Sequence, residues 1–207
     1  MSIAIIGVGN IGRALAEALI AVGEPVVLAA TQPPRALAKE LGHLASAATT
    51  AEAIEACDVL ILAVWFGVAR ALIERHKSQL VGKVVVDPSN PIAVADQGQF
   101  SRTLPADVSA ASIIAASLAP GTHYAKAFST LNAEVLEQDT NHTPEHVVVF
   151  YATDDEQAQT AVEKLITAVG FTPLKAGGLD AAIRLEAFGD LSGKVFDLGG
   201  ARSALLT

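Results

Sequence analysis

Three glycines near the start of the chain have the spacing of a phosphate-binding turn. Gly7, Gly9 and Gly12 follow the apolar run Ile3–Ile6 and open Ile11–Val22, whose apolar residues recur at helical spacing. In such a strand–turn–helix unit, the first glycine permits a tight turn, the second lets the backbone approach a diphosphate, and the third lets the helix pack on the strand. Free amides and the helix dipole then attract the phosphates. The residues predicted to contact a dinucleotide here are Gly7, Val8, Gly9, Asn10, Ile11 and Gly12. The alternative is a structural glycine turn in an α/β fold that binds something else.

The residues after the second apolar run bear on which dinucleotide fits. In domains of this kind, an Asp or Glu at that position binds the ribose hydroxyls and selects NAD. Here Pro25–Ala30 is followed by Thr31 and Gln32, with Arg35 shortly after, and the nearest carboxylate is Glu40. Thr31 can hydrogen-bond a 2′-phosphate and Arg35 can meet it as a charge, unless Arg35 is a solvated helix residue. The sequence therefore favours NADP over NAD, although Gln32 stands where a phosphate-pairing Arg would be ideal.

Strand-like and helical segments alternate along the chain. The strand-like runs are Ile3–Ile6, Pro25–Ala30, Asp58–Val64, Lys83–Asp87, Tyr124–Phe128, His146–Tyr151 and Phe171–Leu174. The helical patterns are Ile11–Val22, Arg35–Leu41, Thr50–Ala56, Val68–Leu80, Ser109–Leu118, Ala133–Gln138, Glu156–Val169 and Leu179–Phe188. This rhythm predicts an α/β fold of Rossmann type, with a doubly wound, mostly parallel sheet between two helix layers. We expect residues 1–175 to form the NADP-binding domain and residues 176–207 a small C-terminal helical extension packed on it.

Composition limits the classes of function. The chain has 207 residues, is 51% apolar and carries a net charge of −8, which argues against nucleic acid or an anionic membrane as the main partner. Its single cysteine, Cys57, excludes an internal disulfide framework and favours the cytoplasm. No secretion leader is seen, and the longest apolar stretch, Val59–Val68, is too short to cross a bilayer. The residues that indicate a homodimer contact near the C-terminus are Val195, Leu198, Leu205 and Leu206.

Ligands of doubly wound sheets bind beyond the carboxyl ends of the strands, so residues there are the candidates for a reaction pocket. The candidates are Ala63, Val64, Trp65, Ser89, Asn90, Pro91, Ser129 and Thr130. Trp65 is expected either to wall a nicotinamide or to pack in the core. Asn90 is expected to hold the nicotinamide carboxamide or nearby backbone, or to cap its own turn beside Pro91.

Other polar residues fit the pocket less well. His123 lies at the beginning of its strand, which is the wrong end for the site, and His142 and His146 lie in a loop around Pro144 that does not suit a metal. Lys126 and Arg184 can meet an anionic part of a second substrate or form ordinary ion pairs. The sequence offers no catalytic triad and no metal cluster. The long irregular stretch Pro88–Pro105 is expected to be functional.

Several motifs recur together in one known family. They are Gly7–Gly12, Val84–Ile92 with its Asp-Pro-Ser-Asn-Pro, Lys126–Leu131, Asp154–Glu156, and Ala176–Leu179 followed by Ala182–Glu186. The set resembles the coenzyme F420-dependent NADP oxidoreductases and their reductase relatives over nearly the full chain. The resemblance implies a Rossmann fold, NADPH as one hydride carrier, and a deazaflavin or flavin as the second substrate. The chain departs from the family where it has Thr31-Gln32 for Ser-Arg, Ser129 for Asn, and Gly178 for Pro.

The leading hypothesis is therefore a NADP(H)-dependent oxidoreductase that transfers a hydride between NADPH and a deazaflavin (coenzyme F420) or a flavin such as FMN. Cofactors would carry this chemistry, and the protein would position two flat rings and exclude water. One alternative is a catalytically idle NADP-binding redox sensor or subunit. Another is an imine or pyrroline-type reductase, although those enzymes usually need a long helical C-terminal domain and only a short segment follows residue 175 here.

Overall fold

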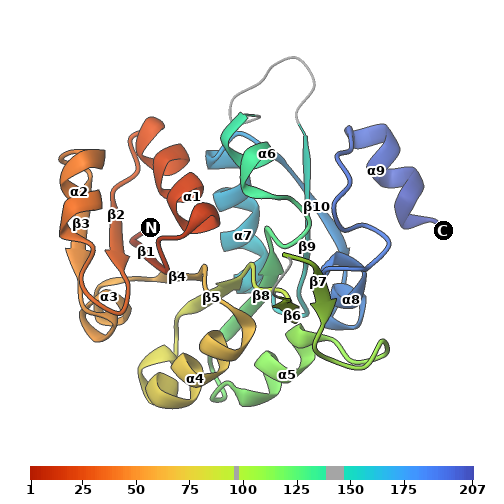
Figure 1. Ribbon diagram of the computed structural model, residues 1–207, viewed down its shortest axis with the longest axis horizontal. Coiled ribbons are helices and arrows are strands. Elements are labelled where there is room, and N and C mark those ends of the chain that lie inside the picture. Colours follow the sequence, from red (N-terminus) through yellow and green to blue (C-terminus); the bar gives the residue numbers. More distant parts are fainter. Residues whose placement is uncertain (96–97, 139–146) are drawn as a thin grey trace.

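An eight-stranded sheet forms the centre of the protein in the computed structural model, which describes residues 1–95, 98–138 and 147–207 (Figure 1). The strand order is β10-β9-β8-β5-β4-β1-β2-β3, and neighbours pair in parallel except β8 with β9. The strands are β1 (Ile3–Ile6), β2 (Val26–Ala29), β3 (Ala45–Ala48), β4 (Val59–Leu62), β5 (Val84–Asp87), β8 (His123–Ala127), β9 (Val148–Ala152) and β10 (Thr172–Gly177). The prediction of a doubly wound, mostly parallel Rossmann-type sheet is confirmed.

Helices cover both faces of this sheet. One apolar core lies under α1 (Asn10–Ala21), α2 (Arg35–Leu41), α6 (Ala133–Gln138) and α7 (Glu156–Ala168). The other core lies under α3 (Thr50–Ala56), α4 (Phe66–His76), α5 (Ala110–Ser117), α8 (Ala182–Leu185) and α9 (Leu198–Leu205), together with the 3₁₀ turns η1 (Lys77–Leu80) and η2 (Leu179–Ala181). Because both faces are covered, β1, β4 and β5 are buried at every residue and read as continuous apolar runs. No helix in the described part of the chain has the length and apolarity to cross a membrane.

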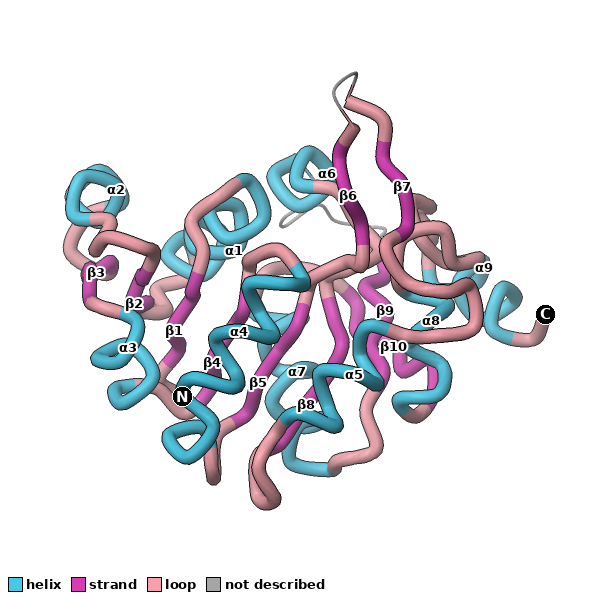
Figure 2. Tube along the Cα trace, turned by 60° about the horizontal axis from the view of Figure 1, so that its bottom comes forward, coloured by secondary structure: helices cyan, strands magenta, loops and turns pink. Residues whose placement is uncertain are grey.

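The structure differs from the sequence-based expectation in its short elements. Strand β3, with the sequence Ala-Ser-Ala-Ala, was not predicted, because small residues carry little strand signal. The stretch Pro88–Pro105, expected to be irregular, contains an antiparallel hairpin of β6 (Ile92–Val94) and β7 (Phe100–Arg102). Figure 2 shows this hairpin projecting away from the main sheet.

The ends of several helices also differ from the prediction. Helix α3 has the predicted bounds, Thr50–Ala56, and its N-cap is Thr49, which closes a capping box with Glu52 three residues later. The predicted helix Leu179–Phe188 is wrong at its last three residues, because the helical turns end at Leu185 and Glu186 adopts an extended backbone. Helix α9 was not predicted. The domain boundary near residue 175 stays a prediction.

A buried ion pair joins two central strands at their carboxyl ends. Asp87 on β5 and Lys126 on β8 are register partners, both are fully buried, and the Lys126 Nζ lies 3.0 Å from a carboxylate oxygen of Asp87. The Tyr124 hydroxyl donates to the same oxygen at 2.8 Å. Burial, and then the Asp87 charge, raise the pKa of Tyr124 well above its ordinary value, so this hydroxyl stays protonated and remains a donor.

We predict that Lys126→Met lowers the free energy of unfolding by about 3–5 kcal/mol, because it leaves the Asp87 carboxylate buried without its counter-charge. Urea unfolding measures this change. The matched control is Lys175→Met, at an exposed lysine on β10, which should stay within about 0.5 kcal/mol of the wild type. Equal effects of the two substitutions would contradict the prediction.

Candidate functional site

The glycine turn after β1 is held by close contacts between backbones. Gly7 has φ of 98°, and its amide donates to the Ala29 carbonyl at 2.9 Å. A Cβ on Gly7 would lie 2.2 Å from the Ala63 carbonyl oxygen, and a Cβ on Gly12 would lie 1.9 Å from the Gly7 carbonyl oxygen. Both positions therefore require glycine for the fold itself. The first turn of α1 is thereby pressed against the ends of β1 and β4, where the strand order reverses.

Gly9 is different, because none of the described residues explains its lack of a side chain. Its φ of −73° suits any residue, and a Cβ there would meet no atom within 4 Å. Gly9 is the N-cap of α1, and no side chain of the described residues accepts a hydrogen bond from the first amides of this helix. The first turn also contains no acidic residue. Open space beside uncapped amides fits the close approach of a diphosphate.

The predicted partners of a 2′-phosphate lie at the end of β2 and the start of α2. Thr31, Gln32 and Arg35 are all exposed, and the guanidinium of Arg35 donates no hydrogen bond to the described part of the chain. Glu40, the nearest acid, instead contacts Arg13 of α1, whose Nη2 lies 2.5 Å from a Glu40 oxygen. The first carboxylate that follows β2 in the sequence is therefore already paired within the protein.

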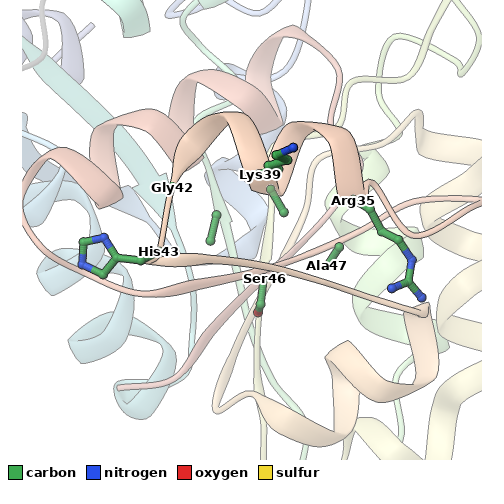
Figure 3. Close-up of a pocket in the computed structure, with 8 residues that line it drawn as sticks. Arg35, Lys39, Gly42, His43, Ser46 and Ala47 are labelled. Carbon is green, nitrogen blue, oxygen red and sulfur yellow. The ribbon is translucent and has the colours of Figure 1, made fainter.

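A surface pocket of about 470 Å³ lies between α2 and the edge strand β3. Figure 3 shows Arg35 and His43 at opposite ends of α2, with their side chains directed away from each other. The small residues Ala38, Gly42 and Ala47 line the space between them. Arg35 is the one predicted site residue in this lining, so the pocket is separate from the glycine turn.

Two buried hydroxyls lie near the predicted reaction pocket. Ser89 follows β5 and Thr130 follows β8, and both side chains are at least nine-tenths buried. Neither hydroxyl has a hydrogen-bond partner among the described residues. Because an unpaired buried hydroxyl is costly, these two atoms are suited to a polar ligand group.

Asn90 connects this pocket to the C-terminal segment. Its amide nitrogen donates to the Ser129 carbonyl at 3.1 Å, and its amide oxygen accepts from the Ala187 N–H at 2.7 Å. Ser129 in turn donates through its hydroxyl to the Leu185 carbonyl. Asn90 thus binds nearby backbone, one of its predicted roles, and its contact with a nicotinamide carboxamide stays a prediction.

The remaining predicted residues surround the same end of the sheet. Trp65 begins α4 as its N-cap and is 56% exposed, so it is not a core residue. Ala63 and Val64 are half-buried beside the glycine turn, and Pro91 is buried. The predicted role of Trp65 as an apolar wall beside a nicotinamide stays a prediction.

Other candidate polar residues are engaged elsewhere. His123 lies at the opposite end of β8, as expected, with its Nδ1 2.7 Å from Asp155. Burial opposes ionisation of Asp155, but hydrogen bonds from Ala158 and His123 lower its pKa on balance. Arg184 is ion-paired with Asp190 at 2.7 Å. His142 and His146 lie outside the described residues.

A second charged contact was missed from the sequence. Arg102 on β7 and Glu186 form an ion pair at 3.1 Å, and the Glu186 side chain is fully buried. The same carboxylate accepts hydrogen bonds from Ser109 and from the Ala111 amide at the start of α5. The only sequence signal was an acidic residue within an apolar helical pattern, which did not identify its distant partner.

Comparisons with known proteins agree with this architecture. Residues 2–91 match the family model described as NADP oxidoreductase, coenzyme F420-dependent. The chain is 30% identical over 199 residues to the F420-dependent NADP reductase of Methanothermobacter marburgensis, covering 90% of this chain and 88% of that protein. It is 31% identical over 185 residues to metalloreductase STEAP3 of Rattus norvegicus, covering 89% of this chain but only 36% of that protein.

A solved structure is similar along almost the whole chain. A hypothetical protein from Sinorhizobium meliloti superposes with a TM-score of 0.84 at 30% identity, covering 95% of each chain. Together with the near full-length match to the archaeal reductase, the comparisons assign the family. The chain belongs to the family of coenzyme F420-dependent NADP oxidoreductases.

Proposed function

We propose that the protein transfers a hydride between NADPH and a deazaflavin or flavin. The observation that carries this proposal is the uncapped start of α1 with open space at Gly9, in a chain whose family is that of NADP oxidoreductases. The archaeal relative is named for F420 and NADP, whereas the rat relative is named a metalloreductase. The acceptor is therefore the part of the proposal that experiment must decide.

In this proposal the amides of Asn10 and its neighbours at the start of α1 hold the diphosphate. Thr31, Gln32 and Arg35 face the 2′-phosphate, and the absence of an acid at that point of the sequence favours NADP. The nicotinamide end then extends toward the carboxyl ends of β4, β5 and β8.

The bound nicotinamide would supply the hydride, and the chain's own residues would position it. Ser89 and Thr130 offer unpaired buried hydroxyls for polar ring substituents. Trp65, exposed at the end of β4, offers an apolar surface that excludes water from one side of the ring. Orientation of two rings at contact distance is the main requirement of hydride transfer, so no acid or base is assigned.

The test mixes the protein and NADPH with oxidised F420 or with FMN and follows NADPH absorbance. We expect NADPH oxidation that saturates in NADPH and in at least one acceptor. Saturable NADPH binding without turnover would instead favour the redox-sensor alternative. No saturable response to NADPH or NADH up to millimolar concentrations would refute the proposal.

The glycines provide a matched pair of substitutions. Gly12→Ala should destabilise the protein by about 1–3 kcal/mol, because the new Cβ collides with the Gly7 carbonyl. Gly9→Ala should leave the melting temperature nearly unchanged but weaken NADPH binding at least tenfold, because its Cβ enters the space reserved for the diphosphate. Thermal melts and NADPH titrations of both variants measure these effects. Unchanged NADPH affinity in Gly9→Ala would show that this turn does not bind the diphosphate.

Arg35 provides a test of cofactor preference. A charged hydrogen bond contributes about 1.5–3 kcal/mol, so Arg35→Ala should weaken NADPH binding by about 10- to 100-fold and leave NADH binding unchanged. The control is Arg75→Ala, an exposed arginine in the last turn of α4, at the far end of that helix from Trp65. Equal loss of NADPH and NADH affinity in Arg35→Ala would show that Arg35 does not contact the 2′-phosphate.

A further inference from the structure

Phe188 combines two features that disfavour a phenylalanine at that position. Its φ is 72°, in the left-handed region that bulky residues rarely adopt, and its side chain is 64% exposed. Glycine would have neither the steric cost nor the exposed apolar ring. Phe128, the other non-glycine residue with positive φ among the described residues, is 1% exposed, so core packing accounts for it. Packing does not account for Phe188.

The backbone on both sides of Phe188 is fixed. The Ala187 N–H donates to the Asn90 side chain, and the Ala187 carbonyl accepts from Arg102 at 3.1 Å. Next to Phe188, a Cβ on Gly189 would lie 2.4 Å from the Arg184 carbonyl oxygen, so this glycine sits tightly against the end of α8. The Gly189 amide also donates to the Glu186 carbonyl at 2.8 Å. Strained residues persist only where their surroundings hold them in this way, and they gather at functional sites.

Phe188 is also next in sequence to a residue that contacts the predicted reaction pocket. It directly follows Ala187, which binds the same Asn90 side chain that holds the Ser129 backbone. With Arg102, Ile183 and Arg184 it lines a pocket of about 250 Å³. The two arginines of this lining are already paired with Glu186 and Asp190, so the pocket presents a ring and neutralised charges rather than a free cation.

We infer that Phe188 is a specificity-determining residue that stacks on the flat ring of the second substrate. The inference rests on the proposed function and names what the acceptor must present at this point, namely an extended aromatic face such as that of a deazaflavin or a flavin. Aromatic stacking of this kind is optimal when the protein ring is held rigidly in place, which the strained and fixed backbone provides.

Three substitutions separate the ring from the backbone strain. Phe188→Ala removes the ring and keeps a side chain at positive φ, Phe188→Gly removes both, and Phe188→Tyr keeps the ring. We expect the first two to raise the KM for F420 or FMN by about 2- to 12-fold at saturating NADPH, with the KM for NADPH unchanged. Phe188→Tyr should behave as the wild type. Only Phe188→Gly should raise the melting temperature, so this variant gains stability as it loses acceptor affinity.

Val81→Ala is the matched control, because Val81 is an apolar residue that is 50% exposed and lies before the start of β5, at the end of that strand away from the proposed reaction pocket. Its acceptor KM should equal that of the wild type. Unchanged acceptor KM in both Phe188→Ala and Phe188→Gly would overturn the inference. So would a change in oligomeric state on analytical ultracentrifugation, since the ring would then belong to a contact between copies of this chain.

Equilibrium binding separates this inference from the proposed reaction. Quenching of FMN or F420 fluorescence by the NADP⁺-loaded protein reports acceptor binding without turnover. If the acceptor binds in a Phe188-dependent manner and no NADPH is oxidised, the reaction is wrong and the stacking role stands. If the wild type oxidises NADPH with an acceptor whose affinity is the same in Phe188→Ala, the stacking role is wrong and the reaction stands. If neither FMN nor F420 binds, the stacking role is overturned.

Discussion

Backbone contact between the glycine turn and the ends of β1 and β4 is the constraint on which the candidate site depends. Gly12 and Gly7 lack side chains because the first turn of α1 rests directly on the turn that precedes it. This contact fixes where the free amides of α1 point, at the place where the strand order reverses. A dinucleotide has a limited length. In the proposed function, a diphosphate held there directs the nicotinamide toward the neighbouring carboxyl ends of β4, β5 and β8.

At the opposite end of the site, after β5, side-chain contacts rather than glycines hold the backbone. Here a buried ion pair, Asp87 with Lys126, holds the turn after β5, since Asp87 accepts from the Ser89 amide and Lys126 donates to the Ser89 carbonyl. Asn90 then attaches the C-terminal segment through the backbone of Ala187. Contacts to backbone do not depend on which side chain the segment carries. The side chains of this segment can therefore differ while these backbone contacts remain. The fold alone consequently does not determine the acceptor.

The sequence predicted the parts of the structure that depend on local pattern. The runs that became β1, β4 and β5 are apolar throughout, and a parallel sheet covered on both faces requires such runs. Strand β3 was missed because its four residues form an edge and its sequence is Ala-Ser-Ala-Ala. The helix expected to reach Phe188 ends at Leu185, because Glu186 adopts an extended backbone and the Ala187 amide donates to the Asn90 side chain instead of to a helical carbonyl.

The candidate site, too, was predictable from the sequence only where it depends on a local pattern. The glycine spacing located the turn between β1 and α1, at which we propose that a diphosphate binds, since three residues within one turn carry that signal. The partnership of Asn90 with Ala187 spans 97 positions, and that of Arg102 with Glu186 spans 84, so neither leaves a local pattern. Phe188 looked like one more apolar residue of an amphipathic helix. Its strain and exposure exist only in the folded chain.

The electrostatics of the proposed phosphate site depend more on the charged groups close to it than on the net charge of the protein. The chain has a net charge of −8, yet the proposed ligand is an anion. Charges spread over the surface are screened beyond about 8–10 Å at physiological salt, whereas contact groups act in full. In the proposed function the contact groups are the α1 amides and Arg35, and the first acid that follows them in the sequence after β2, Glu40, is held by Arg13 at 2.5 Å. The Arg13–Glu40 ion pair thus offsets the charge of the first acid that follows Arg35, so that in the proposed function a phosphate at Arg35 meets less of that negative charge.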